Sequence, residues 1–161
     1  MENFQYLLDK IYNSTIIESP YPHIYIDNFF NEEDFSKIIN SNGVNTKNYQ
    51  DNDELFNSLF DLGYKIIDFP GCINNVEEYN SWHRSKHSSK KLHSACEGFG
   101  MTLRLLDPRS TFLERLKSFI ESSDFNLALA SKFSIDVDSV YSDNGLQKYL
   151  DGYEISPHPD I

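Results

Sequence analysis

The sequence predicts an α+β fold, with helices over most of the first 135 residues and short strands gathered near the C-terminal end. Apolar residues recur at helical spacing in several segments before Ile135. From Val137 onward, short apolar runs alternate with turn-forming Asp-Asn-Gly and Asp-Gly sequences, which predict three closely spaced strands. Because 39% of the residues are hydrophobic, with 12 Phe and 10 Tyr, we expect residues 1–161 to form a single folded domain.

Apolar stripes and capping residues locate the helices. The predicted segments are residues 2–12, 32–41, 52–62, 112–122 and 124–134. The last four of these segments have the expected N-caps Asn31, Asp51, Thr111 and Asp124, in that order. Gly43 is expected to end the helix at 32–41, and Gly63 the helix at 52–62. Asp51 and Thr111 each precede a Glu by three residues, which is the spacing of a capping box.

Three further segments alternate in the manner of strands, and one long segment has no period. The predicted strands are residues 23–30, 64–69 and 101–106. Between the last two, Cys72 to Lys91 predicts a long polar surface loop. Residues 82–93 hold Arg84, Lys86, Lys90 and Lys91 without an acid, so this stretch is either a cationic flap for an anionic substrate or, as we favour, a solvated loop. His83, His87 and His93 are weak candidates for metal ligands.

The charge balance restricts the kinds of partner. A net charge of −11 opposes general affinity for nucleic acid or for an anionic membrane surface. The sequence has neither a run of 18 apolar residues nor a basic, then apolar, leader, so we expect a cytoplasmic protein. The partners expected are a small molecule or another protein. Cys72 and Cys96 form no close-spaced pair, which predicts neither a disulfide framework nor a CxxC motif.

The chemistry is concentrated in the last residues, Tyr149 to Ile161. His158 and Asp160 are two residues apart, so in a strand their side chains project from the same face. Pro157 and Pro159 restrict the backbone around His158 to extended conformations. An imidazole and a carboxylate together suit a divalent first-row metal ion. The pair therefore predicts two ligands of a metal site.

The motif around this pair resembles a known family. Tyr149-x-x-Gly152 ahead of His158-x-Asp160, together with PYPHIYIDNFF over residues 20–30, is similar to the 2-oxoglutarate- and Fe(II)-dependent oxygenases, in particular the prolyl-hydroxylase-like branch. The resemblance implies a helical N-terminal part followed by the opening strands of a double-stranded β-helix, or jelly roll. It also implies a hydroxylase that couples 2-oxoglutarate decarboxylation to C–H hydroxylation. His158 and Asp160 would hold Fe(II), and Tyr149 would either lie near 2-oxoglutarate or be a core residue of a strand. Ascorbate would be an additional cofactor.

The sequence also departs from the family pattern. It ends one residue after Asp160, so the distal His and the cationic anchor for 2-oxoglutarate are missing. We therefore expect half an active site, no assignable catalytic residue and little turnover by these 161 residues alone. We expect the sheet edge to be covered by a second copy or a companion segment, or to be blunted by Pro157 and Pro159. Two alternatives remain: a non-catalytic acidic scaffold or interaction module, and a structural zinc site completed by loop histidines.

Overall fold

The computed structural model describes residues 4–69, 72–85, 100–139 and 144–153. The chain divides into two compact units, which are described separately below. One unit comprises residues 1–45 and 110–144 and is called the helical unit. The other comprises residues 46–109 and 145–161 and is called the sheet unit.

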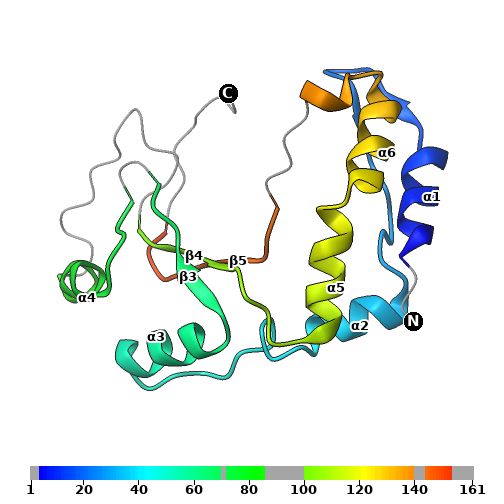
Figure 1. Cartoon of the computed structure of the whole chain (residues 1–161). Coiled ribbons are helices and arrows are strands. Elements are labelled where there is room, and N and C mark those ends of the chain that lie inside the picture. The colour runs from blue at the N-terminus through cyan, green and yellow to red at the C-terminus, as the bar shows by residue number, and fades with distance from the viewer. Residues whose placement is uncertain (1–3, 70–71, 86–99, 140–143, 154–161) are drawn as a thin grey trace. The chain divides into compact units, whose positions relative to one another are not determined.

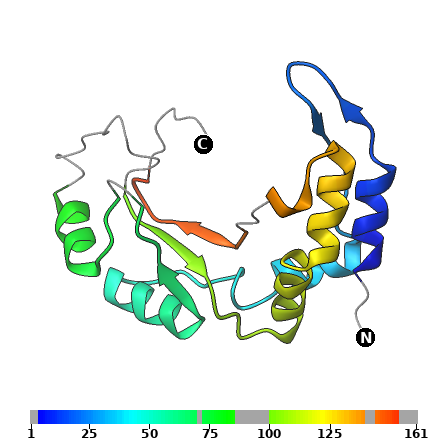
Figure 2. The same ribbon diagram turned by 45° about the horizontal axis from the view of Figure 1, so that its top comes forward.

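The helical unit is built on α1 (Gln5–Asn13), α2 (Glu32–Ile39), α5 (Thr111–Ile120) and α6 (Ser123–Phe133). Helix α1 packs on α6, and α5 contacts both α2 and α6 (Figures 1 and 2). Leu8 and Ile11 of α1 pack against Ala128 of α6, because the apolar stripe of α1 recurs every three to four residues. A short antiparallel hairpin, β1 (Ile16–Ile17) with β2 (His23–Ile24), completes the unit.

The helix caps follow local side-chain chemistry. Asn31 accepts a hydrogen bond from the Asp34 backbone N–H at 2.8 Å and begins α2, as predicted. Two predicted caps are wrong by one or two positions. Ser110 rather than Thr111 caps α5, and Ser122 rather than Asp124 caps α6, because these serines are extended and their hydroxyls accept the orphan N–H groups.

The sheet unit contains a three-stranded antiparallel sheet in the order β3 (Tyr64–Ile66), β4 (Thr102–Leu105), β5 (Gln147–Tyr149). Tyr64 pairs with Leu105, and Thr102 pairs with Tyr149. Helix α3 (Asn52–Asp61) packs on β3, and α4 (Val76–Arg84) precedes β4 in the chain (Figure 1). Among the described residues of this unit, the buried apolar side chains are Phe56, Leu59, Tyr64, Ile73, Tyr79, Trp82, Met101, Leu103, Leu105 and Leu150.

Gly63 closes α3, as predicted, and the position requires glycine. Its φ is +97°, and a Cβ built there would lie 1.9 Å from the Asp107 carbonyl oxygen. The Gly63 carbonyl accepts hydrogen bonds from the N–H groups of Leu106 and Asp107, both at 3.2 Å. This close approach joins the end of α3 to the end of β4.

The predicted surface loop after Cys72 is wrong where the structure describes it, because α4 forms there. Asn75 caps α4 by accepting from the Glu78 N–H at 2.8 Å, and the three-residue spacing of Tyr79 and Trp82 places both in the core. With so few apolar residues, α4 lacks the long stripe that identifies a helix.

The strand predictions were too long. The segment 23–30 contributes only His23–Ile24 to a strand, and Val137–Ser139 is a 3-10 turn rather than a strand. Of the three strands expected after Val137, the described residues contain β5. The rest of that segment lies outside the described residues.

The expected fold class agrees with the structure, whereas the jelly roll stays a prediction. The fold is α+β with small antiparallel sheets, and helices occur in all five predicted segments. No helix among the described residues is both long and apolar enough to cross a bilayer.

Candidate functional site

Of Tyr149, His158 and Asp160, the structure describes Tyr149, whereas His158 and Asp160 lie outside the described residues. Tyr149 ends β5 and is 54% exposed. Its hydroxyl donates to Gln147 Oε1 at 2.8 Å, and its ring stacks on Tyr153 with centroids 4.4 Å apart. The Tyr149 side chain is therefore held by its neighbours at the strand end.

A tight turn follows β5 directly. The Tyr153 N–H donates to the Leu150 carbonyl at 3.1 Å, and Gly152 has a φ of +80°. A positive φ favours glycine, so this residue allows the chain to reverse here. The Tyr149-x-x-Gly152 sequence thus forms a strand end and a turn.

An open groove of about 430 Å³ lies in the sheet unit beside Tyr149. It is lined by residues 46–52 ahead of and at the start of α3, by Leu55, and by residues 148–151. Half-buried Lys148 lines this groove, and its ammonium donates to Thr46 Oγ1 at 2.9 Å. The same ammonium lies 5.8 Å from the centroid of the Tyr64 ring. Burial lowers the pKa of Lys148 below its ordinary value.

A histidine–carboxylate pair lies at the turn. His83 Nε2 of α4 is 3.1 Å from Asp151 Oδ2, and the imidazole stacks on Tyr79 with centroids 5.5 Å apart. The Tyr79 hydroxyl reaches the Asp151 carbonyl at 3.4 Å. Burial, with a smaller contribution from the Asp151 charge, raises the pKa of Tyr79 to about 12. These contacts attach α4 to the turn that follows β5.

Of the other sequence candidates that the structure describes, His83 contacts Asp151 of the groove lining. Arg84 instead donates from Nε to the Asn80 carbonyl at 3.0 Å. The remaining cationic and histidine candidates, Lys86, His87, Lys90, Lys91 and His93, lie outside the described residues. Within the described ranges, no three residues of the His, Cys, Asp and Glu types come together as metal ligands.

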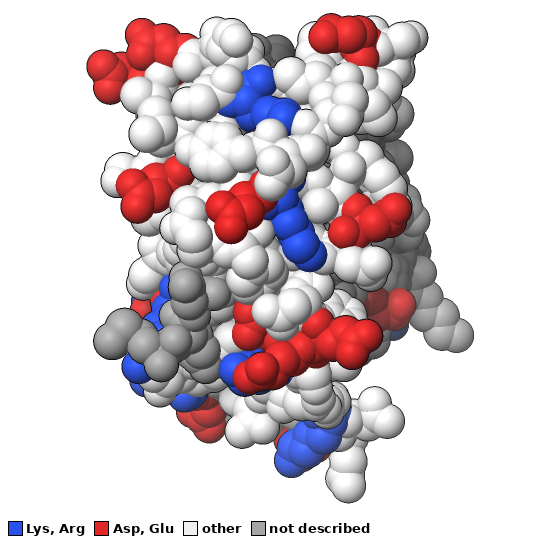
Figure 3. Space-filling model, turned by 90° about the vertical axis from the view of Figure 1, so that its right-hand side faces the viewer, with Lys and Arg blue, Asp and Glu red and all other residues white. Residues whose placement is uncertain are grey.

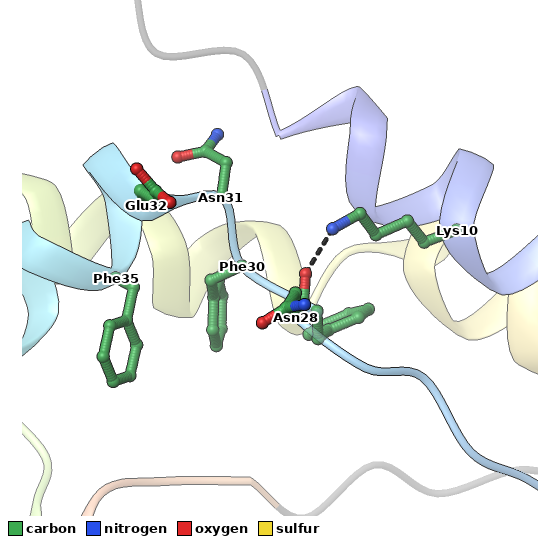
Figure 4. A pocket seen from close by; sticks show the side chains of 7 residues that line it. Lys10, Asn28, Phe30, Asn31, Glu32 and Phe35 are labelled. Atoms are coloured by element: carbon green, nitrogen blue, oxygen red, sulfur yellow. Dashed lines mark hydrogen bonds between the residues drawn. The ribbon is translucent and has the colours of Figure 1, made fainter.

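A second hollow, of about 570 Å³, lies in the helical unit. It is lined by Lys10, Asn28, Phe29, Phe30, Asn31, Glu32 and Phe35. Figure 4 shows the Phe30 and Phe35 rings side by side, and the Lys10 ammonium donating to the Asn28 carbonyl. Because the Lys10 ammonium is engaged with the backbone before α2, we do not single out a ligand-binding charge in this hollow.

Sequence reasoning missed Lys148, although a signal for it existed. In a strand, alternate residues share a face, so Lys148 and Leu150 lie on one face and Gln147 and Tyr149 on the other. Leu150 is 8% exposed, whereas Tyr149 is exposed. The alternation places the lysine on the inward face, where a cation has little water.

The charges on the face drawn in Figure 3 are mixed. Among the described residues shown there, acidic and basic side chains are interspersed and no broad basic patch forms.

Comparison with protein-family models, with curated proteins and with solved structures gives no match.

Proposed function

We propose that this chain contributes the first metal-ligand strand of a non-haem Fe(II)- and 2-oxoglutarate-dependent oxygenase. In this proposal the strand that follows the Tyr149-to-Gly152 turn belongs to a jelly roll, and His158 and Asp160 hold the metal ion. The proposal rests on the family resemblance of the sequence motif. Its structural support is the order of elements that leads into that motif.

The supporting observation is the turn that directly follows β5. Among the described strands, β5 is hydrogen-bonded only to β4, so it lies at the edge of the described sheet. A turn at Leu150–Tyr153 follows β5. A tight turn between two strands is how a hairpin delivers a ligand-bearing strand next to its neighbour. The structure is thus compatible with His158 and Asp160 on a strand that follows β5.

The donor set fits the metal. Imidazole nitrogen and carboxylate oxygen are two of the three protein ligands in the facial site that non-haem Fe(II) oxygenases use. When bound, Fe(II) with 2-oxoglutarate would supply the oxidising power for C–H hydroxylation. The role of this chain is to hold the two donors side by side and to restrict their movement, which Pro157 and Pro159 do by favouring extended backbone.

Metal binding tests the proposal without requiring turnover. Mn(II) is a redox-stable substitute for Fe(II), and its binding is measured by the loss of the free-ion electron paramagnetic resonance signal. We expect one Mn(II) per chain, with binding lost in His158→Ala and in Asp160→Ala. His23→Ala is the matched control, because His23 lies in β2 and its Nδ1 contacts the Tyr21 carbonyl.

The two outcomes of the Mn(II)-binding experiment lead to different conclusions. Loss of binding in both variants, with the His23 control unchanged, supports the metal site. If the wild-type protein binds no more Mn(II) than the His158→Ala and Asp160→Ala variants, the oxygenase proposal is wrong and the non-catalytic scaffold becomes the better interpretation.

A further inference from the structure

Lys148 carries a half-buried charge that the described protein does not neutralise. Its ammonium has three N–H donors, and one of them is used by the Thr46 hydroxyl at 2.9 Å. The Tyr64 ring, 5.8 Å away, offers a weak cation–π contact. Among the residues that the structure describes, no carboxylate forms an ion pair with Lys148, and burial is the cause of its lowered pKa. A cation in this position gains from an anion that comes from outside the chain.

The surroundings of Lys148 have the size and composition of a small-molecule site. The groove measures about 430 Å³, which lies in the range of ligand pockets in proteins. The lining includes Tyr49 and Leu55 beside polar residues, and its charged residues are Lys47, Asp51, Lys148 and Asp151. Of these four, Lys148 is half-buried and the other three are exposed. Ligand sites combine apolar and aromatic residues with a few placed polar groups, and the half-buried ammonium is such a group.

We propose that this groove binds a small aromatic anion, whose carboxylate or phosphate group pairs with the Lys148 ammonium. The carbon skeleton of the ligand lies against Tyr49 and Leu55 of the groove. Thr46 holds the ammonium in place through its hydroxyl, which leaves the other N–H donors for the anion. This site is independent of the proposed metal centre, because it uses neither His158 nor Asp160.

The two acidic residues of the groove lining, Asp51 and Asp151, do not neutralise the charge of Lys148. The Asp51 carboxylate accepts the Glu54 backbone N–H at 2.8 Å as the cap of α3. The Asp151 carboxylate contacts His83 at 3.1 Å, and its side chain is 78% exposed. Water and salt screen exposed charges strongly, whereas the half-buried ammonium is screened less. An anion that reaches Lys148 therefore meets a half-buried cation, whereas the two acids of the lining are exposed.

The test follows the amide chemical shifts of isotope-labelled protein as each of three matched probes is added. The buffer contains EDTA. Benzoate and phenyl phosphate carry the two candidate anionic groups, and benzamide is the neutral analogue of benzoate. We expect saturable amide shifts at residues 46–52 and 148–151 with either anion or both, and at least tenfold weaker binding of benzamide. The stronger of the two anions identifies the anionic group of the natural ligand.

Substitution of the lysine gives the second measurement. Lys148→Met is expected to weaken anion binding at least tenfold, whereas Lys148→Arg retains part of it. Lys65→Met is the control, since Lys65 lies on β3, pairs with Asp107 at 2.9 Å and is absent from the groove lining. If Lys148→Met does not fold, the comparison of benzoate with benzamide on the wild-type protein decides alone. Equal binding of those two probes, no binding of either anion, or unchanged anion binding in folded Lys148→Met would overturn the proposal.

Discussion

Asp34 in the helical unit and Lys148 in the sheet unit are both ionisable side chains withdrawn from water, but their surroundings differ. Asp34 is 6% exposed and accepts hydrogen bonds from the Tyr6 hydroxyl at 2.7 Å and from Asn31 Nδ2 at 3.3 Å. Lys37 also approaches its carboxylate at 3.8 Å. Lys148 has a single hydroxyl partner, Thr46. The protein therefore satisfies one charge and leaves the other open to a ligand.

This difference separates a structural charge from a functional one. A buried carboxylate with several donors stabilises the fold, because each partner would lose its bond if the carboxylate were removed. A half-buried ammonium with one neutral partner costs desolvation without a compensating ion pair. We thus expect substitutions at Asp34 to affect folding, and substitutions at Lys148 to affect binding but not folding.

The largest expected effect is that of Asp34→Ala. Removal of the carboxylate leaves the Tyr6 hydroxyl and the Asn31 amide without their acceptor and removes an acid from the first turn of α2. We expect a loss of about 2 kcal/mol in the free energy of unfolding. Urea denaturation followed by tryptophan fluorescence and circular dichroism measures it. Asp9→Ala, at an exposed position on α1, is the control and should change stability by less than about 0.5 kcal/mol. Equal stability of the two variants would contradict the structural role of Asp34.

A smaller effect is expected for Tyr6→Phe, and it depends on pH. Burial and the hydrogen bond to Asp34 raise the pKa of Tyr6 to about 12, above its ordinary value of 10.0. A raised pKa means that the stabilisation by the protonated phenol is complete below pH 10 and is lost as the pH rises toward 12. We expect Tyr6→Phe to cost about 1 kcal/mol at neutral pH.

The pH profile tests whether burial and the bond to Asp34 together hold the Tyr6 phenol protonated in the folded state. The stability difference between wild type and Tyr6→Phe should stay constant up to about pH 10 and shrink between pH 10 and 12. Tyr79, whose pKa is also raised, is present in both proteins and cancels in the difference. A difference that is independent of pH would mean that the bond to Asp34 contributes little.

The comparison also shows what a sequence can predict. Asn31 and Asp51 were identified as caps because capping depends on a side chain and a backbone N–H three residues apart. Ser110 was missed because its neighbour Thr111 has an equally good local pattern with Glu114. Local chemistry thus predicts the presence of a helix more reliably than the residue at which the helix begins.

Helix α4 and the groove depend on contacts that no local pattern reports. Tyr79 and Trp82 are buried by the sheet unit, and without that packing α4 reads as a polar segment. The bond from Lys148 to Thr46 joins residues 102 positions apart. Strand alternation could place Lys148 on the inward face, but only the folded chain shows that the described partner there is a hydroxyl rather than a carboxylate.

The smallest expected effect is that of Lys148→Met on stability, and it completes the comparison with Asp34. Burial lowers the pKa of Lys148, so at neutral pH the folded state holds a proton at a cost that the unfolded state does not have. As the pH rises from the lowered pKa toward the ordinary value of 10.5, that cost disappears and the wild-type protein gains stability. Methionine fills a similar volume without the charge, so Lys148→Met should equal or slightly exceed wild type at pH 7, within about 0.5 kcal/mol. This advantage should diminish as the pH approaches 10.5.

Thermal unfolding of wild type and Lys148→Met at pH 7, 9 and 10.5 measures the difference in stability. A clear loss of stability in Lys148→Met at pH 7 would show that the lysine, like Asp34, holds the fold together, and the contrast between the two charges would then fail.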